Sequence, residues 1–296
     1  FLNTIFTIYF FLIFFFFKDI KKNYLIILSI LSPLFLIFPI AEREALGRKD
    51  ILIPLFLIFY CIIFNYFKFL SLSFFLIIIY IPLLLIHEVA IFYLPFFYLI
   101  LLFKIEKINF YKILIIFLSS LLFLLIIYIL SNTTHTNEEI KLMCDKMTNI
   151  FNEQCGMPAY VLNRNLSDNI AEIGNLSAIH ILRNLSIFLF GNIALIFLIF
   201  ISSLKHSKQN IINKYFNFKI LSILIFLPTI IPFIIAVDWG RWFNLSYTML
   251  IIFYFFCLKN NMIFINKDNK FFNYFNNFFK TKKNLLFLIL ILCFTW

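Results

Sequence analysis

The sequence predicts an all-α fold, a polytopic transmembrane bundle of about nine or ten helices with one larger non-cytoplasmic loop. Hydrophobic residues make up 63% of the 296 residues and charged residues 13%, and the mean hydropathy is +0.99. Soluble domains are about half apolar and one quarter charged. The apolar residues form continuous runs, and the basic residues gather in short segments between them. We therefore expect a single transmembrane domain over residues 1–296.

Continuous runs favour helices, because lipid leaves no partner for backbone polar groups and barrel strands would alternate. Ten candidate spans lie between the charges: Phe1–Phe17, Tyr24–Ile40, Ile51–Phe67, Phe69–Ile86, Val89–Phe103, Ile113–Leu130, Leu185–Leu204, Ile220–Val237, Phe243–Leu258 and Leu285 onward. Between Ile51 and Phe103, two long tilted helices could replace three short ones. A first residue other than Met and a last run shorter than about 20 residues suggest a fragment at both ends.

The orientation follows from Lys and Arg, which short loops retain on the cytoplasmic side. Basic residues gather in Lys18–Lys22, at Lys68, and in Lys104–Lys112, Lys205–Lys219 and Lys259–Lys283, which alternate correctly in the ten-span count. These segments hold 17 basic and three acidic residues, against eight basic and eleven acidic residues elsewhere. The net charge of +11 is therefore a topology signal, and no nucleic-acid partner is implied.

The longest polar segment, residues 131–183, is expected to form a non-cytoplasmic loop or cap. Apolar residues at helical spacing, such as Ile140, Met143 and Met147, predict amphipathic helix within it. Cys144 and Cys155 both lie there. In an oxidising compartment a disulfide between them is favoured over a metal site.

The first candidate site is the charged segment Glu42–Asp50. A helical register would place Glu44 and Arg48 one turn apart on one face. Arg48 and Lys49, at the start of a helix, are suited to hold a phosphate by a forked contact and a point charge. The alternative is a solvated turn whose charges end two helices.

The second candidate site is His87-Glu88, which lies between two strongly apolar runs where ionisable groups are costly. Glu88 is suited to act as a general base, and His87 to orient it or bind an anion. The fourth residue after His87 is Ile91, not His, so the spacing does not predict a zinc site. The alternative is a pair of residues at a water-exposed turn.

The third candidate site is Asp238-Trp239-Gly240-Arg241-Trp242, expected as a turn between two spans. Arg241 between aromatic residues would suit a pyrophosphate whose sugar stacks on Trp239 or Trp242. An aromatic belt at the membrane boundary with a local Asp-Arg ion pair is the alternative.

The many spans, the large external loop and external arginines resemble the O-antigen polymerase and related polysaccharide repeat-unit polymerase family, chiefly through Arg48, Arg241 and residues 131–183. The resemblance implies a multi-pass glycosyltransferase of the bacterial inner membrane that joins lipid-diphosphate-linked oligosaccharides on the periplasmic face without a nucleotide sugar. We expect neither a cofactor nor a metal. Arg48 and Arg241 would hold the diphosphate, and Glu88 or Asp238 would activate the acceptor hydroxyl.

Three alternatives stay open. One is a glycosyltransferase of the lipid-phosphosugar type. Another is a transporter or flippase in which His87, Glu88 and Asp238 form a proton or ion relay. The third is a non-enzymatic membrane subunit.

Overall fold

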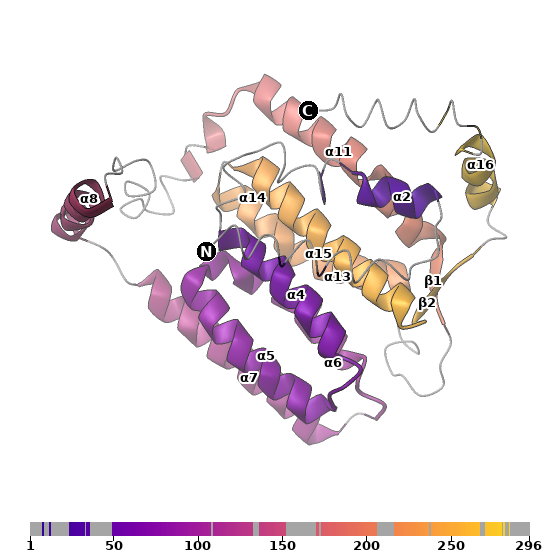
Figure 1. The fold of residues 1–296 in the computed structure, drawn as a ribbon, viewed down its shortest axis with the longest axis horizontal. Helices are drawn as coiled ribbons and strands as arrows, with labels where there is room; N and C mark the ends of the chain where they lie inside the picture. Colours follow the sequence, from indigo (N-terminus) through magenta and orange to yellow (C-terminus); the bar gives the residue numbers. More distant parts are fainter. Residues whose placement is uncertain are drawn as a thin grey trace.

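The computed structural model shows a bundle of helices (Figure 1). It describes residues 8, 12, 24–32, 34–35, 49–107, 109–132, 136–151, 170–171, 173–205, 216–236, 238–266, 270–279, 281 and 284. Within these residues almost all regular structure is helical, apart from one pair of short strands. The predicted all-α class is confirmed for this part of the chain.

The α-helices are α2 (Tyr24–Ile30), α4 (Leu52–Ile63), α5 (Phe69–Ile86), α6 (Leu94–Leu102), α7 (Phe110–Ser131), α8 (Asn137–Phe151), α11 (Ala178–Ile201), α13 (Phe218–Phe226), α14 (Ile231–Ile235), α15 (Trp239–Lys259) and α16 (Lys270–Phe279). Three 3₁₀ turns join them: η3 (Lys49–Ile51), η4 (Glu88–Tyr93) and η5 (Leu227–Ile230). Strands β1 (Ser202–Leu204) and β2 (Ile263–Ile265) pair antiparallel, Ser203 opposite Phe264.

Five helical segments are long and apolar enough to cross a membrane. They are α5, α7, α11, the continuous run α13-η5-α14 (Phe218–Ile235) and α15. The run Glu88–Leu102 is apolar but shorter, and α4 has 12 residues. The chain thus has the fold of a multi-pass membrane protein. The predicted spans 1–17 and 285 onward lie outside the described residues, and the total of nine or ten spans stays a prediction.

The stretch between Ile51 and Phe103 contains three separate helices, so the alternative of two long helices was wrong. Several predicted boundaries were also wrong; for example, α4 ends at Ile63 rather than Phe67. Helix α15 begins at Trp239 rather than Phe243: Arg241 lies in its first turn, and this single charge interrupts the apolar run without ending the helix. Helix α11 begins at Ala178 rather than Leu185, with the Ser177 side chain accepting a hydrogen bond from the His180 amide. The predicted loop 131–183 therefore ends earlier than expected.

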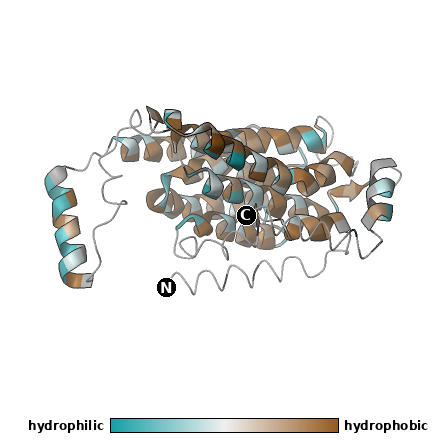
Figure 2. Ribbon diagram, turned by 90° about the horizontal axis from the view of Figure 1, so that it is seen from above, coloured by the Kyte–Doolittle hydropathy of each residue, from teal (hydrophilic) through white to brown (hydrophobic). Residues whose placement is uncertain are grey.

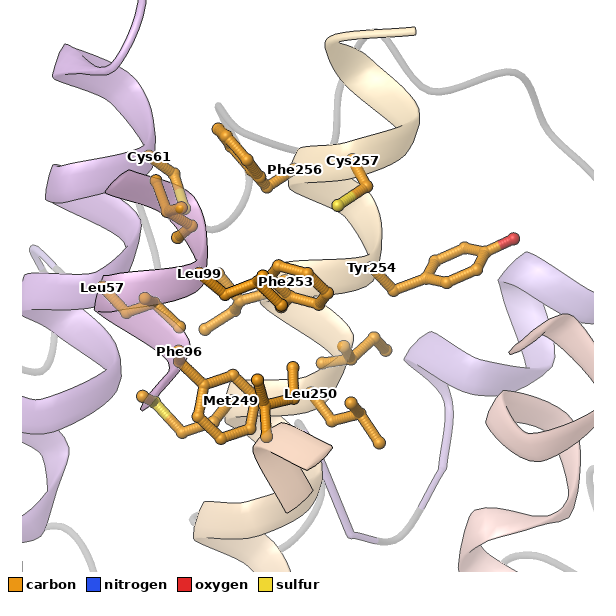
Figure 3. Close-up of a cluster of buried hydrophobic side chains, with 14 of the residues drawn as sticks. Leu57, Cys61, Phe96, Leu99, Met249, Leu250, Phe253, Tyr254, Phe256 and Cys257 are labelled. Atoms are coloured by element: carbon orange, nitrogen blue, oxygen red, sulfur yellow. The ribbon is translucent and has the colours of Figure 1, made fainter. Parts of the chain in front are cut away.

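Helix α15 forms the centre of the bundle. In its most apolar window 83% of the residues are buried, against 11% for α7. Figure 3 shows side chains of α15 such as Phe253 packing toward α4 and α6. A buried helix needs apolar residues around its whole circumference, and every residue from Leu245 to Cys257 of α15 is buried.

Contacts of the described residues in the basic segments from Lys68 onward place these segments together at one end of the bundle. The Lys104 ammonium lies 4.0 Å from the Phe64 ring centroid, and the Lys112 ammonium 5.6 Å from that of Phe69. Strands β1 and β2 join the segments that follow α11 and α15. Helices α4, α5, α6 and α7 therefore run alternately up and down, as the charge pattern predicted, and we call this end the basic end. Which end faces the cytoplasm stays a prediction.

Helix α8 lies away from the bundle and is largely hydrophilic (Figures 1 and 2). Its start is a capping box: the Thr136 amide donates to Glu139 Oε2 (2.9 Å), and the Glu139 amide donates to Thr136 Oγ1 (3.3 Å). The predicted amphipathic helix in the long loop is therefore confirmed. Cys144 is disulfide-bonded, and Cys155, its predicted partner, lies outside the described residues.

Candidate functional site

The site is at the end of the bundle opposite the basic end, where three loops meet. Its centre is Asp50 in η3, at the entry to α4. Asp50 is 7% exposed, although an ionised carboxylate is costly to bury unless it is paired. A carboxylate is electrostatically favoured before a helix N-terminus. The cost of burying Asp50 is offset chiefly by the two cationic or polar side chains described next.

His87 contacts Asp50 directly, through Nε2 and Oδ1. The residue ends α5 with an extended backbone, φ −151° and ψ 96°, and its amide donates to the Leu83 carbonyl. This break turns the imidazole out of the helical ladder and toward η3. A neutral His87 that donates from Nε2 to the carboxylate presents the lone pair of Nδ1. The side chain is also buried, so the pair forms a His-Asp dyad with a fixed orientation.

Arg241 approaches the dyad from the first turn of α15. Its Nε lies 3.3 Å from Asp50 Oδ2 and 3.6 Å from Asp238 Oδ2. The guanidinium carbon lies 4.2 Å from the centroid of the Trp242 ring, a cation–π arrangement. The Trp242 ring is in turn 6.3 Å from the His87 ring. Trp242 therefore packs beside both the arginine and the histidine.

Two buried donors of this turn, Trp239 Nε1 and Trp242 Nε1, make no hydrogen bond with the described residues. The other two buried atoms outside hydrogen-bond geometry, Arg241 Nε and Asp50 Oδ2, face each other as an ion pair at 3.3 Å. Buried donors usually have a partner, and exceptions call for an explanation. The side chain of Asp238, which precedes α15, makes no capping hydrogen bond, so the amides of the first turn add to the donors. This concentration of donors suits a ligand rich in acceptor oxygens.

The remaining predicted residues take different positions. Lys49 Nζ donates to the Ile86 carbonyl at 2.8 Å, which fastens η3 to the end of α5 beside His87. Glu88 is exposed and makes no ion pair or side-chain hydrogen bond with another described residue. Arg48 lies outside the described residues. The structure thus brings His87, Asp238, Arg241 and Trp242 together around Asp50, whereas the Trp239 ring packs against Phe243, with centroids 6.5 Å apart. Catalysis by Glu88, substrate binding by Trp239 and phosphate binding by Arg48 and Lys49 stay predictions.

Sequence reasoning gave no role to Asp50. It belongs to the charged segment already noted, but the helical-face argument used Glu44 and Arg48 instead. A usable signal was present: Asp50 is an acid directly before an apolar run, on the side where His87 and Arg241 were expected. Tyr93, whose hydroxyl is 3.3 Å from Ser246 Oγ, was also missed. Its side chain is fully buried in the apolar core.

Neither a metal-binding group nor a similar protein identifies the role of this site. Within the described residues, no group of three His, Cys, Asp or Glu side chains gathers in a metal-binding arrangement. The fold and the site together define a helical membrane-type bundle with an Asp-His-Arg cluster at one end, in which Asp50 and His87 are buried and Arg241 is half-buried. No protein-family model, curated protein or solved structure matches this chain.

Proposed function

We propose that the chain is an integral membrane enzyme of surface polysaccharide biosynthesis that transfers or polymerises lipid-diphosphate-linked oligosaccharides on the non-cytoplasmic face. The observation that carries the proposal is the cluster of Asp50, His87 and Arg241. It joins a proton acceptor and an anion-binding group where three loops of one predicted membrane face converge. Buried ionisable groups in a membrane bundle are costly and are typical of functional sites.

In this proposal His87 is the general base. The acceptor hydroxyl attacks the anomeric carbon of the donor sugar while its proton passes to His87 Nδ1. The bond between that carbon and the diphosphate oxygen breaks, and its electron pair leaves with the lipid diphosphate. Asp50 holds the imidazole and stabilises the imidazolium that forms, as in other His-Asp pairs. Base catalysis of this kind typically contributes about 10²–10⁴-fold in rate.

Arg241 is the group proposed to hold the departing diphosphate. A guanidinium binds phosphate oxygens by forked contacts, and the indole N–H groups of Trp239 and Trp242 are further donors on the same turn. Asp238 and Asp50 orient the guanidinium through its Nε. Holding an anion by preorganised donors stabilises the charge that develops on the leaving group.

The test is the surface-glycan profile of cells that carry the full-length gene, its deletion, or single variants. The informative variants are His87→Gln, Asp50→Asn and Arg241→Gln. Glu106→Gln is the matched control, because Glu106 is an exposed acid at the basic end. The amount of each protein in the membrane is measured in parallel.

In the deletion and in the three site variants, we expect the long-chain ladder to be lost and a single repeat to remain. In Glu106→Gln we expect a normal ladder. An unchanged ladder in the deletion strain would reject the polymerase assignment. Arg48→Ala tests the additional phosphate contact suggested by the sequence, and Glu88→Gln tests the alternative base.

A transporter is the second candidate, and a specific observation favours it. The Asp50-His87 pair is buried at one end of the bundle, and buried pairs of ionisable groups serve as proton relays in membrane carriers. The span α13-η5-α14 is interrupted by the 3₁₀ turn η5, which contains Pro228, and Pro232 lies at the start of α14. Transporters have broken helices of this kind. Proton uptake into vesicles containing the purified protein, abolished by Asp50→Asn, would select this candidate over the enzyme.

A further inference from the structure

Helix α16, Lys-Phe-Phe-Asn-Tyr-Phe-Asn-Asn-Phe-Phe over Lys270–Phe279, has a strongly two-sided sequence. At about 100° per residue, its six aromatic positions fall within one arc of about 160°. The three Asn positions and Lys270 occupy the rest of the circumference. This division is sharper than packing against one neighbouring helix requires.

The structure covers one edge of this aromatic arc and leaves the other exposed. Phe272 is 7% exposed and belongs to the bundle core, and α16 contacts α2. At the opposite edge, Tyr274 and Phe278 are 69% and 44% exposed. Their rings stack on each other, with centroids 6.5 Å apart. The exposed edge is thus an ordered aromatic surface beside the bundle, not a set of isolated side chains.

The charge around α16 specifies what covers this edge. The segment Lys259–Lys283 holds six Lys residues and one acid, Asp268. The chain enters α2, the neighbour of α16, directly after the basic segment Lys18–Lys22. Figure 1 shows α16 on the same side of the bundle as β1 and β2, which mark the basic end. Aromatic side chains flanked by lysines suit an anionic lipid surface, where rings insert at headgroup depth and ammonium groups meet lipid phosphates.

We propose that α16 is an in-plane interfacial helix that inserts the Tyr274–Phe278 edge into an anionic leaflet while Phe272 keeps it docked to the bundle. The lysines of Lys259–Lys283 supply the preference for anionic headgroups. This inference concerns the basic end of the molecule and is independent of the chemistry at Asp50 and His87. It assigns α16 as the element that couples the bundle to the lipid composition of one leaflet.

The experiment uses spin labels on the purified full chain in nanodiscs of phosphatidylcholine, alone or mixed with phosphatidylglycerol. Labels are attached to Tyr274→Cys and Phe278→Cys, with Asn273→Cys and Asn277→Cys as matched controls on the polar arc of the same helix. All four positions are exposed in the structure, and Cys61 and Cys257 are buried. The unsubstituted chain, treated with the same label, sets the background. Collision rates with oxygen and with a water-soluble nickel complex report depth.

We expect a several-fold higher oxygen-to-nickel collision ratio at positions 274 and 278 than at 273 and 277. The difference should be larger when phosphatidylglycerol is present. This effect of phosphatidylglycerol should disappear when Lys270, Lys280, Lys282 and Lys283 are all changed to Gln. A Lys141→Gln variant in α8 controls for charge alone. Equal nickel access at all four positions, or low access to both reagents at 274, would overturn the proposal, the latter by indicating a protein partner. Insertion that does not depend on phosphatidylglycerol would overturn the assignment of an anionic lipid.

Discussion

Replacing Asp50 tests the cluster as a coupled unit. The Asp50 carboxylate is 10% exposed and the Arg241 side chain 26% exposed. Breaking a fully buried ion pair by removing one partner costs about 3–5 kcal/mol. Asp50→Asn should cost less, roughly 2–3 kcal/mol, because solvent screens part of the guanidinium and the amide oxygen can still accept from His87.

The coupling between Asp50 and Arg241 is the sharper quantity. In a double-mutant cycle of Asp50→Asn and Arg241→Gln, we expect a coupling of roughly 1–2 kcal/mol. The same cycle with Asp238→Asn should give less, about 0.2–1 kcal/mol, because the Asp238 carboxylate is 41% exposed and 3.6 Å from Nε. The assay is reversible unfolding of the detergent-solubilised chain, followed by circular dichroism. A coupling below about 0.5 kcal/mol between Asp50 and Arg241 would refute the reasoning.

Two further predictions concern packing and charge outside the cluster. A Cβ atom at Gly191 would lie 2.5 Å from Leu34 Cγ, whereas one at Gly174 would meet nothing within 4 Å. Gly191→Ala should therefore destabilise the chain by roughly 1–3 kcal/mol in the same unfolding assay. An equal effect of Gly174→Ala would contradict this. Burial lowers the pKa of Lys104 below its usual 10.5. The unfolded chain therefore binds more protons at this residue, and stability rises with pH. The unfolding free energy of the unmodified chain minus that of Lys104→Gln should increase as the pH approaches 10.5. A difference that is constant or falls would show that the folded state does not disfavour this charge.

The general fold could be predicted because hydropathy and charge are summed over whole segments. Continuous apolar runs identify helices without knowledge of their neighbours, and the alternation of Lys-rich segments agrees with the contacts at Phe64 and Phe69. Boundaries were harder to predict. The first turn of α15 carries a charged residue, and hydropathy alone cannot distinguish a polar helix end from a turn. The structure shows that Trp239–Trp242 is helical and that Arg241 of this turn reaches Asp50 in η3.

The sequence predicted which kinds of residue form the site, but not which of them contact each other. Sequence placed His87 and Arg241 at the same membrane face, which is a matter of topology. Which acid they meet depends on how α4, α5 and α15 rotate about their axes, and that rotation is set by long-range packing around residues such as Phe96 and Phe253. Asp50 is therefore the partner of His87, although Glu88 is its neighbour in the chain.

The central claim is that the Asp50-His87-Arg241 cluster performs chemistry on a lipid-linked glycan, and in vitro turnover tests it most directly. Purified chain in lipid vesicles is given a polyprenyl-diphosphate-linked oligosaccharide, and both chain length and released lipid diphosphate are measured. The account predicts elongation by the unmodified chain and by Glu106→Gln, and a loss of about 10²–10⁴-fold in His87→Gln. Undiminished elongation by correctly folded His87→Gln, or no elongation by the full-length unmodified protein, would contradict it.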